Sequence, residues 1–544
     1  MQIQIRINEE GALRNQRFAF TDRFTLVTEL LQNARRAGAF RIAVDHLAEE
    51  QVLRVHDDGH GIGDFQKLLS FHESGWDDGT VAQEHPFGIG FTKCLYAATR
   101  IVATSGQLRV DIDTAAALQR AAFEVETMAQ AVAGTTIELH GVQIADLDKR
   151  METLCEGFPV GVVFNGKPLQ RRYADDHLAL MFTPIGAVHV AGNRSGKATR
   201  DTLVFLQGFC VKRPSYFKAD DVNIIHLDPR QFMARLPDRD TLIDADQQLK
   251  RVEAQVKQCW RTILEVAKTQ LAPQQFVATY FDAMRQWGHV DVLNDMDTLP
   301  AEILQRITGY PIQSGYGEDY VAAVALVPSR HEIESGQVRL VSLGSPDSEN
   351  AGHWMLARQK GWLIAQAYYL DKDHWIHPHV RYIESDKALI EPQSETSRTQ
   401  LEGRWVWPLV ILCESIRICV GDQEAIVVED GVCCDDQILV PPGETSGEPV
   451  RQLSSFIDEH ERYRESDMEA DCDALAALIR RLRSTDPAAT LGSLLSDLGL
   501  GKYPLLHGQR FEVTVGVGAM PGCSVELVGT DAAPLFDGDS RAER

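Results

Sequence analysis

One segment constrains the fold of this chain more than any other: TDRFTLVTELLQNARRAG, at residues 21–38. Its apolar residues recur three and four positions apart, which predicts one amphipathic helix that packs on a core. The residues on this face are Phe24, Val27, Leu30, Leu31, Ala34 and Ala37. Thr21 and Asp22 are favourable N-cap residues and Gly38 is a favourable terminator, so the expected helix fills the whole segment.

Two polar residues of this helix suggest a site. Glu29 and Asn33 lie four positions apart, one turn along the same face. A carboxylate and a carboxamide stacked in this way can hold a water molecule beside a metal ion. On an arbitrary helix, a polar stripe that faces solvent is the commoner explanation, so the assignment depends on the segments that follow.

A glycine-rich turn follows the helix. The runs FRIAVDH and QVLRVHDD have strand-like composition and predict a hairpin, and the second run ends in DDGHGIG at residues 57–63. Gly59, Gly61 and Gly63 would let the backbone approach a ligand closely. Asp57, at the end of the strand, could accept a hydrogen bond from an amino group such as that of adenine. A tight turn without a ligand would also explain this motif.

The next glycines precede a second helix. Residues 64–85 are polar, have no strong period and suit a mobile segment over a site. PFGIGFTK then leads into an apolar helix, and Gly88 and Gly90 would leave its first backbone N–H groups free to hold phosphate oxygens. The phosphate-binding loop GxxxxGK[ST] is absent, and no dinucleotide-binding fingerprint lies in a strand–helix–strand context.

The order of the elements predicts the fold class. After the second helix come strand-like runs at residues 100–104, 107–112 and 122–128, and a last strand that begins with Gly134 and Thr135. A helix, a hairpin, a loop, a second helix and then antiparallel strands predict an α+β chain whose first domain is a two-layer α/β sandwich.

Length and composition limit the class of protein. At 544 residues, a prior of about 150 residues per domain predicts three or four domains. The formal net charge of −24 argues against a chain whose main task is to coat nucleic acid. No apolar run is long enough to span a membrane, the polar N-terminus does not resemble a signal peptide, and the ten scattered cysteines contain no CxxC pair. These features predict a cytoplasmic protein with reduced thiols.

Four motifs, in this order and at this spacing, resemble those of the GHKL ATPase superfamily with its Bergerat nucleotide-binding fold: ELLQNARRAGA, DDGHGIG, FGIGF and GTT. The superfamily includes gyrase-type topoisomerases, ninety-kilodalton heat-shock chaperones, histidine kinases and MutL mismatch-repair proteins. The resemblance covers about the first quarter of the chain, residues 1–150, and implies a Mg²⁺-dependent ATPase.

The resemblance implies a role for individual residues. Glu29 would be the general base that orients and activates the attacking water, and Asn33 would bind Mg²⁺ at the phosphates. Asp57 would accept a hydrogen bond from the adenine amino group, and Thr135 would support that contact through water. Residues 64–86 would form the ATP lid. Backbone contacts to the nucleotide would come from Gly59, Gly61, Gly88 and Gly90, with the last two at the phosphates.

Two polar residues in or beside the motifs depart from the family pattern. They are His60, within the second motif, and Lys93, just after the third. The resemblance implies no role for either residue, and we expect both side chains to be exposed to solvent.

Residues 151–268 resemble the transducer domain that follows the ATP domain in the chaperone, MutL and topoisomerase branches, and end in a long helix predicted over residues 244–270. Histidine kinases lack this domain, so the kinase branch is set aside. The resemblance is closest to the chaperone and MutL branches. In MARLPDRDTLID, Arg239 resembles the chaperone arginine that returns to the γ-phosphate, where it would stabilise transition-state charge. A surface charge at a helix start explains Arg239 equally well. Lys212 and Arg213 are the nearest match to the lysine loop of the other branches.

The second half of the chain is less informative. Residues 269–445 predict a mixed α/β region, PPGETSG at residues 441–447 predicts a linker, and residues 446–544 predict a helical region with a terminal strand. Two clusters could bind a metal, although a polar loop and an acidic helix face explain them better. They are Asp371, Asp373, His374, His377 and His379, and the run DEHE at residues 458–461.

Two main functions stay open. The first is an ATP-hydrolysing clamp that dimerises through its N-terminal domain, closes on a protein client or partner and reopens on product release. The second is a module in which ATP occupancy, with slow or absent hydrolysis, signals assembly with a partner effector, as in bacterial stress and phage-defence systems. A DNA-repair or topoisomerase-like machine is less favoured, because the chain is acidic and lacks a nuclease motif and a lysine loop.

Overall fold

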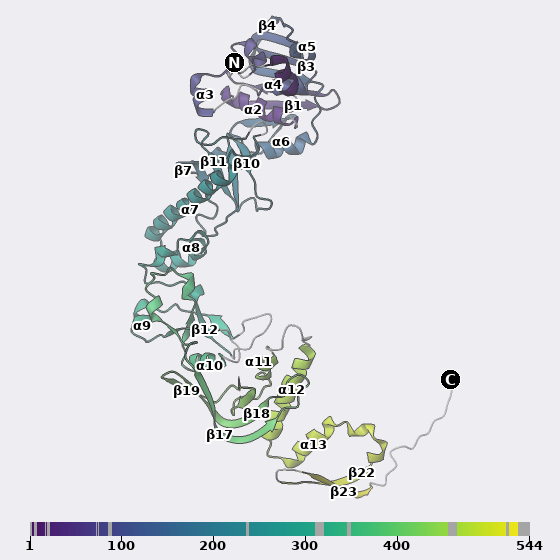
Figure 1. Ribbon diagram of the computed structural model, residues 1–544, viewed down its shortest axis with the longest axis vertical. Coiled ribbons are helices and arrows are strands. Elements are labelled where there is room, and N and C mark those ends of the chain that lie inside the picture. The colour runs from purple at the N-terminus through teal and green to yellow at the C-terminus, as the bar shows by residue number, and fades with distance from the viewer. Residues whose placement is uncertain are drawn as a thin grey trace, which may run out of the picture. The chain divides into compact units, whose positions relative to one another are not determined.

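The computed structural model describes the chain except for residues 1–2, 5–7, 17, 19–21, 72, 74, 85–89, 236–238, 310–319, 345–349, 455–464, 518–521 and 531–544. The chain divides into two compact units: Met1–Pro300 with Tyr368–Trp375, and Ala301–Ala367 with Ile376–Arg544. Both units combine helices with mixed sheets, which agrees with the predicted α+β class (Figure 1). Among the described helices, none has the length and apolar composition needed to cross a membrane.

The first unit begins with a six-stranded mixed sheet in the order β3-β4-β2-β1-β5-β6. Its strands are β1 (Arg41–Leu47), β2 (Val52–Asp57), β3 (Arg100–Asp113), β4 (Val125–His140), β5 (Gly161–Phe164) and β6 (Lys167–Pro168). β1 and β2 form the predicted hairpin, β4 pairs antiparallel with both β2 and β3, and β5 pairs parallel with β1. The predicted domain boundary at residue 150 therefore lies within the segment that builds this sheet, and the division into four domains stays a prediction.

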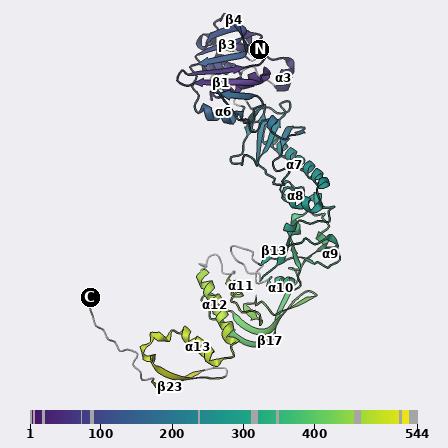
Figure 2. The same cartoon turned by 180° about the vertical axis from the view of Figure 1, so that it is seen from behind.

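Helices form a second layer on this sheet. Figure 1 shows α2 and α4 in front of the strands, and Figure 2, from behind, shows the strands in front. The apolar stripe of α2 packs in one core with Ile42, Val44 and Leu53 of the hairpin. The helices of this part are α1 (Glu9–Gln16), α2 (Thr25–Arg36), α3 (Asp78–Glu84), α4 (Thr92–Ala97), α5 (Thr114–Leu118) and α6 (Leu147–Cys155).

Helix α2 is shorter than the segment that predicts it. It begins at Thr25, and the predicted cap Thr21 lies outside the described residues. Asp22 accepts a hydrogen bond from the backbone N–H of Phe24 at 2.9 Å, so it shapes the turn before the helix and does not cap the helix itself. At the other end, Gly38 has φ +73°, the left-handed conformation expected of a helix terminator.

A second, five-stranded sheet follows in the order β10-β9-β11-β8-β7. Its strands are β7 (Met181–Thr183), β8 (Gly186–His189), β9 (Thr202–Leu206), β10 (Phe209–Lys212) and β11 (Asn223–Leu227). The two-residue turn between β9 and β10 has positive φ at both Gln207 and Gly208, as a type I′ turn requires. Helix α7 (Ala245–Gln270) confirms the predicted long helix, and α8 (Pro273–Trp287) ends at Gly288 in the left-handed conformation.

The two sheets of the first unit contact each other directly. Phe158, just before β5, stacks on Phe209 of β10 with ring centroids 5.1 Å apart. A Cβ atom at Gly157 would lie 2.3 Å from the ring of Phe205, so only glycine fits there. The second sheet is therefore held against the first by close packing and not by a flexible connection.

In its described residues, the second unit holds two five-stranded sheets and a hairpin. The first, in the order β13-β12-β15-β14-β16, contains β12 (Leu304–Ile307), β13 (Val321–Ala323), β14 (Leu340–Ser342), β15 (Leu363–Ala365) and β16 (Val380–Tyr382). The other contains β17 (Ala388–Gln400), β18 (Leu409–Val420), β19 (Gln423–Val427), β20 (Val432–Cys434) and β21 (Gln437–Val440). The hairpin pairs β22 (Gln509–Val515) with β23 (Cys523–Thr530). The helices are α9 (Arg330–Glu334), α10 (Ala351–Gln359), α11 (Val450–Ser454), α12 (Glu465–Leu482) and α13 (Pro487–Asp497).

The prediction of a linker at residues 441–447 is wrong. Glu444 is buried and accepts hydrogen bonds from the backbone N–H groups of Gly431 and Ser446, at 2.9 and 2.7 Å. The guanidinium group of Arg483 donates to the carbonyl oxygens of Pro442 and Glu444, at 3.1 and 2.6 Å. This segment is a packed turn between β21 and α11, because proline and glycine mark tight turns as well as linkers.

Candidate active site

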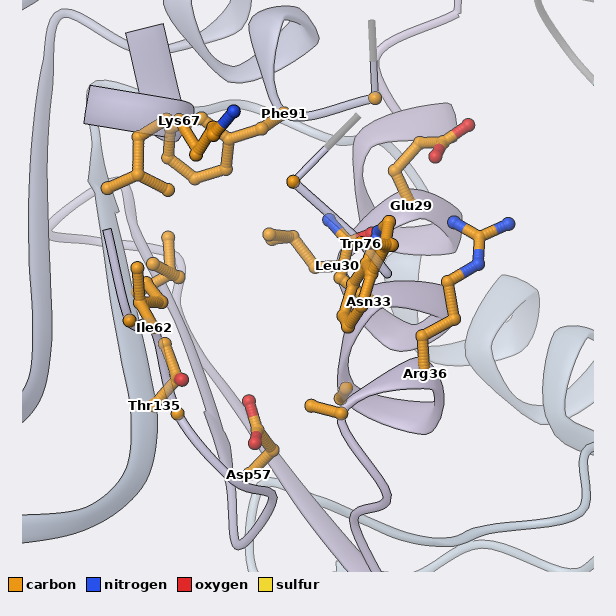
Figure 3. A pocket seen from close by; sticks show the side chains of 18 of the residues that line it. Glu29, Leu30, Asn33, Arg36, Asp57, Ile62, Lys67, Trp76, Phe91 and Thr135 are labelled. Carbon is orange, nitrogen blue, oxygen red and sulfur yellow. The ribbon is translucent and has the colours of Figure 1, made fainter. Parts of the chain in front are cut away.

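The described part of the first unit contains a pocket of about 400 Å³ between α2 and the strands β2 and β4 (Figure 3). Residues predicted for the site come together here from segments far apart in the sequence. The pocket is lined by seven of the nine: Glu29, Asn33, Asp57, Gly61, Gly90, Thr135 and Arg239. Gly59 belongs to the turn beside the pocket, and Gly88 lies outside the described residues.

Helix α2 contributes a polar stripe of three residues. Glu29, Asn33 and Arg36 follow one another at spacings of four and three, which place their side chains on one face of the helix. All three line the pocket. Figure 3 shows the carboxylate of Glu29 and the guanidinium group of Arg36 side by side along the helix. The stripe therefore combines an acid, an amide and a cation.

Asp57 marks the opposite end of the pocket. It is the last residue of β2, is buried, and lies opposite Thr135 of β4 in the strand register. Burial raises the pKa of Asp57, and the hydrogen bond that it accepts from the backbone N–H of Gly59 offsets this only in part. The arrangement offers a carboxylate beside a hydroxyl, which can receive a hydrogen-bond donor such as an amino group.

The glycine turn is folded tightly against β3 and β4. The hydroxyl of Ser105 accepts a hydrogen bond from the N–H of Ile62 at 2.8 Å and donates one to the carbonyl of Gly134 at 2.9 Å. Gly61 has φ +86°, and a Cβ atom there would lie 2.6 Å from the Ser105 hydroxyl. A side chain at Gly134 would meet the carbonyl of Asp57 at 1.8 Å. These glycines are required because backbone segments approach closely at the pocket wall.

Glu29 is held by cations from two directions. Its Oε1 atom lies 3.0 Å from Nε of Arg239 and 3.4 Å from Nζ of Lys93. Burial alone raises the pKa of Glu29, but the positive charges of Arg239, Lys93 and Arg36 outweigh it and hold that pKa below its usual value. Glu29 is therefore an ionised, acceptor-only carboxylate at neutral pH.

The expectation that the Lys93 side chain is exposed to solvent is wrong. This side chain is 4% exposed, and so is that of Glu29. We expected Lys93 to be exposed to solvent; instead the start of α4 turns it inward, onto the acid of α2. The other departure, His60, is exposed as expected, at the edge of the pocket beside Trp76.

Arg239 reaches the pocket from the segment between β11 and α7. It adopts a left-handed backbone conformation, with φ +57°, and its side chain is largely buried. Its Nη1 atom donates to Oε1 of Gln207 at 3.4 Å, and the same oxygen accepts a hydrogen bond from Gln32 of α2 at 2.6 Å. Of the two explanations for Arg239, the surface charge is thus wrong. Lys212 and Arg213 do not line the pocket.

The segment predicted as a lid borders the pocket. It contains a 3₁₀ turn at Phe65–Leu69 and helix α3, and it contributes Lys67 and Trp76 to the lining. In Figure 3 the Trp76 ring is drawn over α2, near Leu30 and Asn33. Glu84, the last residue of α3, forms ion pairs with Arg35 and Arg36 of α2. The end of this segment is therefore tied to the helix that carries Glu29.

The two clusters considered as metal sites give no support for a metal. Within the described residues, His, Cys, Asp and Glu nowhere gather in a group of three or more that could hold an ion. In the first cluster Asp371 instead accepts a hydrogen bond from Asn294 at 2.9 Å. The run at residues 458–461 lies outside the described residues.

Several residues of the site are not among those predicted from the sequence: Arg36, Lys93, Ser105 and Gln207. Arg36 could have been found, because it continues the spacing of Glu29 and Asn33 by one more turn. The other three occupy the site through contacts between segments distant in the sequence, for which no local pattern exists.

Comparisons with known proteins return a remote similarity. No protein-family model matches the chain, and no curated protein does. Among solved structures, the ATPase region of Saccharomyces cerevisiae topoisomerase II is similar at 13% identity, with a TM-score of 0.32. The match covers 44% of this chain and 89% of that one. The same region bound to ICRF-187 (dexrazoxane) is similar at 12% identity and a TM-score of 0.32, covering 44% and 90%. These values assign no family.

Proposed function

We propose that this chain binds ATP with Mg²⁺ in the pocket of the first unit and hydrolyses it to ADP and phosphate, as its resemblance to the GHKL superfamily implies. One observation carries the proposal. Residues that the four motifs and the distant arginine segment single out converge on a single pocket of about 400 Å³. This volume is in the usual range for small-molecule sites.

The two ends of the pocket differ in charge as ATP binding requires. Asp57 and Thr135 offer acceptors at one end, which suits the adenine amino group. The other end carries Glu29 with the cations Arg36 and Arg239 in the lining. We infer that the base lies at Asp57 and the phosphates lie at Glu29, because cations stabilise phosphate charge.

Glu29 would act on the water that attacks the terminal phosphorus. The water oxygen forms a bond to that phosphorus, the bond to the oxygen shared with ADP breaks, and the water proton passes to the Glu29 carboxylate. The depressed pKa of Glu29 keeps it ionised and able to accept this proton, but it also makes Glu29 a weak base. Orientation of the water would therefore contribute more than proton abstraction.

Arg239 connects binding to this chemistry. Its Nε atom lies 3.0 Å from Oε1 of Glu29 and its Nη1 atom donates to Gln207, so a phosphate that took these donors would displace Glu29. A bound triphosphate would compete for Arg239 as the stronger anion. Loss of this contact would raise the pKa of Glu29 toward its usual value and strengthen it as a base.

The residues present fit a Mg²⁺ ion. Asn33 lines the pocket and is half-buried, one helical turn from Glu29. Mg²⁺ keeps several water ligands and binds proteins through few oxygen atoms plus substrate phosphates, so one carboxamide oxygen is an adequate protein ligand. When bound, the ion would neutralise phosphate charge.

The experiment compares Glu29→Gln with the wild-type protein. Glu29→Gln preserves size and keeps a hydrogen-bond acceptor, so ATP binding measured by calorimetry should stay within a few-fold of wild type. Turnover should fall between about 10²- and 10⁴-fold, the usual effect of removing a general base. Steady-state phosphate release measures it.

Glu73→Gln is the matched control. Glu73 lines the same pocket from the lid segment, is largely exposed and pairs with Lys67. Its variant should turn over ATP as the wild type does. Unchanged turnover in Glu29→Gln would eliminate the proposed chemistry, and absence of nucleotide binding to the folded wild type would eliminate the proposal.

A second function rests on the same ion pairs. Two cations on one oxygen of Glu29 favour slow hydrolysis until a partner or a conformational change removes Arg239. ATP occupancy could then serve as an assembly signal. Single-turnover decay of ATP with and without candidate partners separates the two functions, because a fast partner-independent rate excludes the second. The protein client, dimerisation, the chaperone or MutL branch and a cytoplasmic location stay predictions.

A further inference from the structure

Arg36 is buried at the pocket with part of its guanidinium group unused. Its side chain is 2% exposed. Its Nε atom donates to Oε2 of Glu84 at 2.8 Å, whereas its Nη2 atom is buried and finds no hydrogen-bond partner among the described residues. A buried donor without a partner carries a free-energy cost that is ordinarily avoided, so it needs an explanation.

The ion pair with Glu84 does not supply that explanation. Arg35, the preceding residue of α2, also pairs with Glu84 but does not line the pocket. Arg36 is the member of this pair that faces the pocket, one helical turn beyond Asn33 and beside Glu29. Arg35 and Arg36 therefore share Glu84 as their partner, but only Arg36 lines the pocket.

We propose that Arg36 is a phosphate-binding residue, whose Nη2 atom donates to the terminal phosphate of the bound nucleotide while its Nε atom stays on Glu84. The inference rests on the proposed function, since it takes ATP as the ligand, and it adds a contact that none of the four motifs names. A guanidinium group suits this task, because it presents several N–H donors in a rigid plane and can hold two anions at once.

The position of Arg36 makes it selective for a triphosphate. It lies at the Glu29 end of the pocket, where we place the terminal phosphate, and Asp57 lies at the other end. ADP would leave the Nη2 donor without a partner, whereas ATP would satisfy it. The same side chain would join the terminal phosphate to Glu84 at the end of α3. Occupancy by ATP would thus strengthen the attachment of the lid segment to α2.

The experiment measures the dissociation constants of ADP and of a non-hydrolysable ATP analogue by calorimetry on the full chain. Arg36→Met should weaken the ATP analogue by about tenfold or more, as expected for loss of a charged hydrogen bond, and ADP by less than about threefold. Arg36→Lys keeps the charge but has fewer donors, so its dissociation constant for the ATP analogue should lie between those of the wild type and Arg36→Met. This variant preserves the test if the methionine variant folds poorly. Arg35→Met is the matched control and should leave the ratio of the two constants unchanged.

Glu84→Gln separates phosphate binding from a purely structural role. If Arg36 acts only by holding the lid segment through Glu84, Glu84→Gln will lower the ATP preference as much as Arg36→Met does, and the inference is overturned. An unchanged ATP preference in Arg36→Met and Arg36→Lys overturns it as well. A wild-type protein that binds neither nucleotide refutes the proposed function, whereas these two outcomes refute the role of Arg36 alone.

Discussion

The sharpest test of the site is the addition of one methyl group at Gly90. A Cβ atom there would lie 2.4 Å from Oε2 of Glu29, whereas ordinary van der Waals contact begins near 3.4 Å. The carboxylate must therefore move by about 1 Å in Gly90→Ala. It can move, because it ends a flexible side chain, but its other oxygen is fixed by Arg239 and Lys93.

The displacement of the Glu29 carboxylate should slow ATP hydrolysis. A misplacement of about 1 Å at a reacting group costs about 10²-fold in turnover, equivalent to about 2.7 kcal/mol of activation free energy. We expect Gly90→Ala to fold normally, to bind ATP within a few-fold of wild type and to hydrolyse it about 100-fold more slowly. Phosphate release at saturating ATP measures the rate, and calorimetry measures the binding.

Gly63→Ala provides the matched control. Gly63 lines the same pocket, and a Cβ atom there meets nothing within 4 Å. Its variant should keep the wild-type rate. If Gly90→Ala also keeps that rate while it is folded and saturated with ATP, Glu29 does not act where its present contacts hold it, and the reasoning from this geometry is refuted.

Two further predictions concern the buried ion pairs. Lys93→Met should lower the free energy of unfolding by about 1–3 kcal/mol, because Glu29 loses one buried counter-ion but keeps Arg239. Urea denaturation measures this change in the free energy of unfolding. Lys67→Met is the control, because Lys67 lines the same pocket but is only half-buried. Equal midpoints for Lys93→Met and wild type would contradict the prediction. The pKa of Glu29 lies below its ordinary 4.5, so the stability that its ionised form adds is present above pH 4.5 and is lost as the pH falls through the lower value in the folded protein. The unfolding free energy of Glu29→Gln should therefore depend less steeply on pH below 4.5, and parallel pH profiles for variant and wild type would argue against the depressed pKa.

Local sequence patterns were sufficient to predict that Glu29, Asn33 and Asp57 belong to the site. The spacing of Glu29 and Asn33 fixed their common helix face, and the glycine turn after β2 fixed the place of Asp57. Both features depend on residues within a few positions of each other. The hairpin β1–β2 and the long helix α7 were predicted for the same reason.

Contacts between distant segments could not be predicted in this way. Arg239 meets Glu29 across 210 positions of sequence, and the same residues could equally form an exposed helix start. Lys93 looks like a surface residue until α4 packs against α2 and turns it inward. No strand was predicted at β17, because its composition is polar, yet it pairs with β18 along most of its length. Tertiary context decided each of these cases.

The contact between the β9–β10 turn and α2 determines which fragments are worth producing. A fragment that stops at residue 150 lacks β5, leaves one edge of β1 without its neighbour and removes both Gln207 and Arg239. Its Glu29 would keep Lys93 as its counter-ion but lose the arginine. Nucleotide affinities and crystal structures obtained from such a truncation would therefore report on a Glu29 carboxylate whose surroundings differ from those in the full chain. The shortest useful expression product therefore extends past Arg239 and includes α7, whose Arg251 donates a hydrogen bond to Gln231 of the same segment at 3.2 Å.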